Sequence, residues 1–221
     1  MTLLAVAHRA GNSLAGLHAA NELGVDIVEC DVHALRGRLE VRHLKTAGPL
    51  PFLWDRWELT PAWVPRLGLE EVLRSGRRGA LFMLDLKSRR VGVGHAVAEL
   101  LHARVPVGPV LVCGRFWPSV DHVAAQLPYV RPILSARSRG ELVALEHRVD
   151  GDGPTPYGVS LHVSLLARPE VAAIRRAVEV LMTWPVNDDD TLEQVVGLGA
   201  TGIISDEPEV LQRVLAGRDR G

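Results

Sequence analysis

The stretch DIVECDV at residues 26–32 places two carboxylates, Glu29 and Asp31, inside an otherwise apolar run. A short run rich in Val and Ile is typical of a strand that is buried on both faces of a parallel sheet. We therefore predict a strand over Ile27–Val32. Side chains two apart on a strand point to the same side, so both carboxylates are expected to point at one place.

Runs of the same kind recur along the chain, with helical stretches in the gaps between them. The further predicted strands are Leu3–Ala7, Ala80–Leu86, Val110–Cys113, Arg131–Leu134, Gly158–Leu161, Val180–Trp184 and Gly202–Ile204. The predicted helices are Ser13–Leu23, Leu69–Ser75, Gly94–Ala103, Ser119–Leu127, Arg139–His147, Pro169–Ala177, Asp189–Leu198 and Pro208–Leu215. Strands and helices in strict alternation predict an α/β fold, a (β/α)8 or TIM barrel. A doubly wound open sheet is the alternative, but no strand is followed by a glycine-rich phosphate fingerprint.

Two segments fall outside this alternation. Leu39–His43 is expected to form an extra extended piece, and Lys45–Pro65, rich in Trp and Pro, a long irregular excursion. Loops of that length in a compact domain are usually lids or binding loops. The competing interpretation is that Trp54, Trp57 and Trp63 pack this segment onto the barrel.

Length and charge narrow the class of protein. The 221 residues, 47% of them hydrophobic, suffice for one full-sized core, so residues 1–221 are expected to form a single domain. A net charge of -1 creates no overall field for nucleic acid or an anionic membrane, so any anion must be bound locally. The start of the sequence, which reaches His8 and Arg9 after a short apolar stretch, is expected to be a core strand rather than a signal peptide. No apolar run approaches the roughly 20 residues of a membrane helix. We expect a soluble, cytoplasmic protein without a nucleic-acid partner.

Carboxylates gather at the ends of predicted strands, where a barrel places its active site. Asp85 ends the third strand and is expected to join Glu29 and Asp31. The three offer only oxygen ligands, and alternation along the strand turns the Cys30 thiol away, which favours Mg²⁺, Ca²⁺ or Mn²⁺ over Zn²⁺. The competing interpretation is a rim of salt bridges between these acids and the cations Arg9, Arg42 and Lys87.

Two histidines also lie at the ends of predicted extended segments. His8 follows the first strand, and His43 ends the extra extended piece. Their ordinary pKa lies near neutrality, so one can accept a proton while the other donates one. The histidines on predicted helices are expected to be surface or packing residues: His18, His95, His102, His122 and His147. The sequence leaves the roles of His33 and His162 open.

The ordered set of motifs resembles the glycerophosphodiester phosphodiesterase family over essentially the whole chain. His8-Arg9 resembles the opening His-Arg-Gly of that family, and DIVECDV resembles its Glu-x-Asp strand. Further matching pieces, in the family's order, are LEVRH (39–43), VPRLGLEEVL (64–73), LDLK (84–87), TWPVN (183–187) and GATGIISDEP (199–208). Any one of these motifs is weak, but their order along the chain is specific.

The resemblance implies a TIM barrel and metal-dependent hydrolysis of a glycerophosphodiester to an alcohol and glycerol 3-phosphate, in phospholipid and glycerol metabolism. It implies that the metal ligands are Glu29, Asp31 and Asp85. It implies that His8 and His43 are the acid and base. The residues implied to bind substrate are Arg9 and Lys87, at the phosphoryl oxygens, and Trp184, at the wall of the cleft.

The chain departs from the family pattern at three positions. Gly11 stands where the first motif carries Glu, and Leu44 follows the second histidine where Asp is usual. Asp85 replaces Glu, which withdraws that carboxylate by about 1.5 Å, one carbon–carbon bond. Two alternatives therefore stay open: a catalytically silent barrel that binds phosphorylated ligands, and a phosphodiesterase acting on another substrate such as a lysophospholipid.

Overall fold

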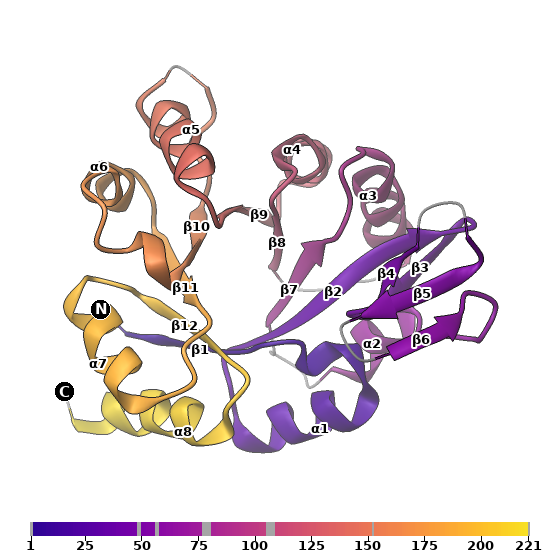
Figure 1. Ribbon diagram of the computed structural model, residues 1–221, viewed down its shortest axis with the longest axis horizontal. Coiled ribbons are helices and arrows are strands. Elements are labelled where there is room, and N and C mark those ends of the chain that lie inside the picture. Colours follow the sequence, from indigo (N-terminus) through magenta and orange to yellow (C-terminus); the bar gives the residue numbers. More distant parts are fainter. Residues whose placement is uncertain are drawn as a thin grey trace.

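The computed structural model describes residues 2–47, 50–55, 58–76, 81–104, 109–151 and 153–220 (Figure 1). Its parallel strands close into a barrel because β1 (Leu4–Ala7) pairs with both the last strand, β12 (Gly202–Ser205), and with β2 (Ile27–Leu35). The strands between them are, in order around the barrel, β7 (Leu81–Leu86), β8 (Val110–Gly114), β9 (Val130–Ala136), β10 (Gly158–His162) and β11 (Val180–Trp184). The predicted (β/α)8 barrel is confirmed, and the extent of the single domain stays a prediction.

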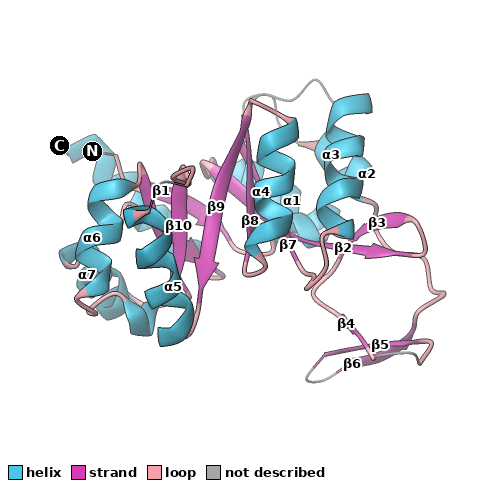
Figure 2. Cartoon of the chain, turned by 90° about the horizontal axis from the view of Figure 1, so that it is seen from above, coloured by secondary structure: helices cyan, strands magenta, loops and turns pink. Residues whose placement is uncertain are grey.

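Helices separate the barrel strands along the chain and lie outside them (Figure 2). They are α1 (Leu14–Leu23), α2 (Leu69–Ser75), α3 (Gly92–Arg104), α4 (Trp117–Gln126), α5 (Arg139–Asp150), α6 (Glu170–Ala177), α7 (Asp189–Gly197) and α8 (Pro208–Ala216). Polar side chains fix several starts: Ser13 accepts from the amide of Gly16, and Asp188 accepts from that of Thr191. The predicted elements agree with these bounds to within a few residues, and Ala80 lies outside the described residues. No helix in the described part of the chain has the length and apolar character needed to cross a bilayer.

Buried side chains form two separate apolar layers. The layer between strands and helices includes Cys30, which confirms that its thiol points away from the barrel interior. The inner layer consists of Val6, Ile27, Met83, Leu111, Cys113, Ile133, Val180, Met182 and Ile204. Both cysteines, Cys30 and Cys113, are buried and free, and burial raises the pKa of each thiol. Packing in these two layers fixes the barrel strands, and with them the side chains at their carboxyl ends.

The segment after β2 departs from the sequence prediction. β3 (Arg38–Val41) pairs with the end of β2, and the expected irregular excursion instead contains a three-stranded antiparallel sheet. Its strands are β4 (Lys45–Thr46), β5 (Phe52–Asp55) and β6 (Glu58–Pro61). Figure 2 shows this small sheet set apart from the barrel, beyond β3. The prediction was wrong because Pro61 lies on the edge strand β6 and Pro51 lies just before β5, where no ladder hydrogen bond is lost.

Trp54 and Trp63 do not pack this segment onto the barrel. Trp54 is 44% exposed and Trp63 is 61% exposed, so the packing interpretation is wrong for both. Trp57 lies outside the described residues. Lys45 places its ammonium 5.4 Å from the centre of the Trp54 ring, on the exposed side of the small sheet.

Candidate active site

A pocket of about 790 Å³ lies at the carboxyl ends of the barrel strands. Residues predicted as functional make up much of its lining, namely His8, Arg9, Glu29, His43, Asp85, Lys87 and Trp184. Asp31 is the remaining predicted residue, and its side chain is fully buried among these groups. The structure therefore brings all the predicted site residues together at the end of the barrel where such folds carry chemistry.

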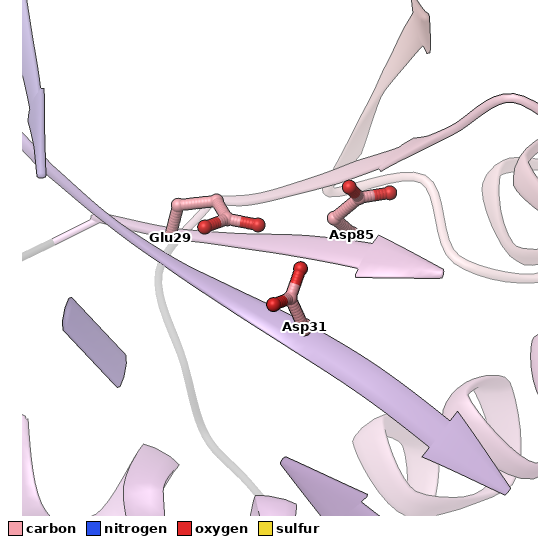
Figure 3. A group of neighbouring side chains, drawn as sticks. All are labelled: Glu29, Asp31 and Asp85. Atoms are coloured by element: carbon pink, nitrogen blue, oxygen red, sulfur yellow. The ribbon is translucent and has the colours of Figure 1, made fainter. Parts of the chain in front are cut away.

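The three predicted metal ligands converge. Glu29 and Asp31 lie on β2, and Asp85 lies directly across from Asp31 on the neighbouring strand β7. Each offers a carboxylate oxygen, and these oxygens all lie within 4.8 Å of one another (Figure 3). Two ligands that each lie 2.0 to 2.6 Å from one ion can be at most about 5.2 Å apart, so this spacing is compatible with a shared cation.

Lys87 lies against two of these acids. Its Nζ is 2.7 Å from Oδ1 of Asp31, and it also donates to Asp85. Burial opposes ionisation of Asp31, but the Lys87 ammonium, a hydrogen bond from Asn12 and the charge of Arg9 together lower its pKa. Burial likewise disfavours the Lys87 ammonium, yet the surrounding carboxylates raise its pKa. The salt-bridge interpretation therefore holds for Lys87, and Arg9 lies 3.7 Å from Asp31, whereas Arg42 pairs with Glu40 instead.

Glu29 carries the uncompensated charge of the cluster. It is 2% exposed, and Oε2 accepts a 2.6 Å hydrogen bond from the backbone amide of Arg9. Burial and the charges of Asp31 and Asp85 raise its pKa, which the more distant Lys87 offsets only in part. A buried acid beside two others is the arrangement that a hard divalent cation relieves, so the donor set fits such an ion.

Both predicted catalytic histidines are paired with carboxylates. Nδ1 of His8 lies 2.8 Å from Oδ1 of Asp206, and Nδ1 of His43 is hydrogen-bonded to Asp55. Asp206 is fixed in turn by Asn187, whose side-chain oxygen accepts its backbone amide at 3.1 Å. A carboxylate at Nδ1 favours the tautomer whose Nε2 is free to accept a proton. The site thus offers two oriented imidazoles beside one acidic cluster.

Comparison with known proteins agrees with this geometry. The model of the glycerophosphoryl diester phosphodiesterase family matches residues 180–209, from β11 to the start of α8. The predicted family resemblance is confirmed. No sequence among the curated proteins matches the chain significantly.

Solved structures of several phosphodiesterases share the fold of this chain. An Oleispira antarctica phosphodiesterase, in complex with the product sn-glycerol-3-phosphate, is similar with a TM-score of 0.76 at 20% identity, over 96% of each chain. A glycerophosphodiester phosphodiesterase from Thermotoga maritima gives 0.73 at 17% identity, over 97% of this chain and 99% of that one. One from Parabacteroides distasonis gives 0.71 at 20% identity, over 99% and 100%. At sequence identities of 20% or less, these similarities show that the chain shares the fold of these proteins.

Sequence reasoning missed several partners of the site residues. Asn12 donates to Oδ2 of Asp31 at 2.9 Å, and its side-chain oxygen accepts the Asp31 amide at 2.8 Å. Asn12 closely follows His8-Arg9 in the sequence, and Asp206 lies in the matched segment GATGIISDEP, so their positions carried a signal. Asp55 carried none, because it reaches His43 from the small sheet outside the barrel pattern.

The two histidines left open by the sequence differ in surroundings. His33 lines the pocket, and burial and the charge of Arg42 lower its pKa to about 3, so it is neutral near pH 7. His162 packs edge-on against Trp184, with ring centres 5.1 Å apart. Neither ring is paired with a carboxylate in the described structure, so neither has the arrangement shared by His8 and His43.

Gly11 explains one departure from the glycerophosphodiester phosphodiesterase pattern. A Cβ at this position would lie 2.7 Å from Cβ of Cys30 and 3.2 Å from the carbonyl oxygen of Glu29. The glutamate of the family's first motif therefore has no room in this chain, whose short turn over Ala10–Asn12 packs directly against β2.

We expect Gly11→Ala to lower the free energy of unfolding by about 1 to 3 kcal/mol, because the added methyl overpacks the contact with Cys30. Urea unfolding measures the change. The matched control is Gly92→Ala at the start of α3, where an added Cβ meets nothing within 4 Å. Equal stability of the two variants would contradict the predicted contact.

Proposed function

We propose that this chain hydrolyses a glycerophosphodiester to an alcohol and glycerol 3-phosphate, using a divalent metal and two histidines. The observation that carries the proposal is the pairing of His8 and His43 with carboxylates in the same pocket as the three-carboxylate cluster. The family match and the shared fold support it. In this proposal, Glu29, Asp31 and Asp85 hold the ion, with Mg²⁺ and Ca²⁺ as the first candidates and Mn²⁺ as a third.

The charge of a phosphodiester repels nucleophiles, so the site must neutralise it. Arg9 and Lys87 line the pocket and can contact the non-bridging oxygens with their cationic groups. A divalent ion bound to the carboxylates would act as a Lewis acid toward the same phosphoryl group. Trp184 lines the same pocket and offers an apolar wall for the substrate.

The two histidines move the protons. Nε2 of one histidine accepts a proton from the nucleophile, either water or a hydroxyl of the substrate's own glycerol. Attack by that hydroxyl releases the alcohol and leaves a cyclic phosphate, which water then opens to glycerol 3-phosphate. The other histidine begins protonated and donates from Nε2 to the leaving alkoxide. Since Asp206 and Asp55 hold the two rings in the same way, either histidine can take either role. Each transfer supplies a rate factor of roughly 10² to 10⁴.

Release of glycerol 3-phosphate from glycerophosphocholine and glycerophosphoethanolamine tests the proposal. We expect turnover with added Mg²⁺, Ca²⁺ or Mn²⁺ and its loss in EDTA, because three converging carboxylates need a cation to bind an anionic substrate. Turnover that persists in EDTA would contradict the metal requirement.

A silent, ligand-binding barrel is the second candidate. The contacts of Lys87 with both Asp31 and Asp85 favour it, because an ammonium already lies between two of the proposed ligands. Binding of glycerol 3-phosphate by a folded protein that cleaves no diester would support this candidate. A cytoplasmic role in phospholipid turnover, without a nucleic-acid partner, belongs to the proposed function and stays a prediction.

A further inference from the structure

Three arginines form an arc on one side of the pocket. Arg89, Arg115 and Arg137 all line it, and they follow β7, β8 and β9 respectively. These strands are consecutive neighbours in the barrel, so their carboxyl ends lie side by side. The arc therefore begins next to Asp85, at the end of β7, and continues away from the carboxylate cluster.

The carboxylate within this arc is already engaged. Glu141 accepts from the guanidinium of Arg115 at 2.6 Å through Oε1, and its Oε2 accepts the backbone amides of Arg137 and Ser138. The contact with the Ser138 amide, together with the bond from the Glu141 amide to the Ser138 hydroxyl, forms the capping box at the start of α5. Partial burial opposes ionisation of Glu141, but its hydrogen bonds and the charge of Arg115 lower its pKa. The carboxylate therefore stays charged, and its oxygens are already engaged in holding the loop.

Two of the three guanidinium groups remain available. Within the described residues, neither Arg89 nor Arg137 forms an ion pair with a carboxylate. The loop that carries Arg89 is held in place, because the hydroxyl of Ser119 donates to the carbonyl of Arg90 at 3.0 Å. Cationic groups are therefore concentrated at one side of a pocket in a chain whose net charge is -1.

The same side is less suited to a cationic headgroup than to an anionic one. Arg137 lies 6.0 Å from the centre of the Trp184 ring, and His162 packs edge-on against that ring. A quaternary ammonium would have to compete with the guanidinium for the aromatic face. Glu141, the acid of the arc, is occupied by Arg115 and by backbone amides.

We propose that Arg89, Arg115 and Arg137 form a second anion site, which selects diesters carrying an additional phosphate monoester or carboxylate. The inference rests on the proposed function and specifies its substrate class. Arg89 and Arg137 bind the second anion directly, and Arg115 adds charge while it holds Glu141 in place. The scissile diester occupies the part of the pocket between Arg9 and Lys87.

A matched set of diesters tests this selection. Glycerol 3-phosphate esterified to glycerol, to glycerate or to glycerol phosphate presents a neutral, a carboxylate or a phosphate group on otherwise similar alcohols. We expect kcat/KM for the anionic diesters to exceed that of the neutral one by about tenfold to hundredfold, the usual contribution of hydrogen bonds to charged groups. A larger factor for phosphate than for carboxylate identifies a phosphate monoester as the preferred group, and the reverse identifies a carboxylate.

The double variant Arg89→Gln/Arg137→Gln is expected to reduce this ratio to about one. Arg139→Gln is the matched control, because Arg139 lies two residues from Arg137 but is 71% exposed and pairs at 3.8 Å with Glu170 outside the pocket. It is expected to keep the wild-type ratio. A ratio near one in the wild type, or a ratio that survives the double variant, would overturn the second anion site while leaving the proposed hydrolysis intact.

Binding provides a readout that does not depend on turnover. Calorimetry with Mg²⁺ present compares glycerol 3-phosphate with glycerol 1,3-bisphosphate. The bisphosphate is expected to bind at least about tenfold more tightly to the wild type, and this advantage is expected to disappear in the double variant. Equal affinities of the two ligands for the wild type would overturn the inference, whereas loss of the proposed hydrolysis alone would not.

Discussion

His43→Ala is expected to lower kcat by about 10² to 10⁴, because the substitution removes one of the two groups that we propose transfer protons. The barrel should stay folded, since the side chain of His43 is 32% exposed and lies outside both apolar layers. Added imidazole should restore part of the activity by entering the space that the ring leaves. Release of glycerol 3-phosphate measures the loss and the rescue.

The matched control for this prediction is His95→Ala. His95 stacks on His122 with ring centres 3.8 Å apart, on helices α3 and α4 outside the barrel, so kcat should stay at the wild-type value. Wild-type kcat in a folded His43→Ala protein would show that the pairing with Asp55 serves structure only. Asp55→Asn should fall between the two, because it keeps the ring but weakens its orientation.

Lys87→Met is expected to lower the free energy of unfolding by about 3 kcal/mol in EDTA, because it removes the cation from the buried Asp31 and its neighbour Asp85. This is the low end of the range for breaking a buried pair, since Lys87 itself is about one-third exposed. Mg²⁺ or Ca²⁺ should restore stability, by about 2.7 kcal/mol at a concentration one hundred times its dissociation constant. Urea unfolding with and without the ion measures both effects.

Lys45→Met is the matched lysine control. Lys45 lies on β4 and contacts Trp54, with no carboxylate partner among the described residues, so its loss should change stability by less than about 0.5 kcal/mol. If divalent ions did not stabilise Lys87→Met, the carboxylate cluster would have no specific affinity for a cation.

The barrel could be predicted from sequence because its signal is local. Each barrel strand is a short apolar run such as Ile27–Val32, and caps such as Asp188 mark where helices begin. The small sheet could not be predicted in this way. Its strands are short, lie between prolines, and leave large side chains such as Leu59, 70% exposed, in solvent. Pairing between such strands depends on partners that periodicity does not reveal.

The candidate site was predictable as far as strand position determines it. Alternation on β2 placed Glu29 and Asp31 together, and closure of the barrel brought Asp85 beside them. The hydrogen-bond partners were harder to predict, because they depend on how loops fold back. Asp55 reaches His43 from another sheet, and the arc formed by Arg89, Arg115 and Arg137 becomes apparent only when β7, β8 and β9 are seen as neighbours.

The small sheet contributes to the surroundings of His43 but takes no part in closing the barrel. The barrel closes through β1, β2 and β12 without any residue of β4–β6, yet Asp55 on β5 orients His43. Substitutions in this sheet can therefore adjust the rate and substrate range while the barrel keeps its stability. The surroundings of His43 can thus be altered from outside the barrel, with little risk to its folding.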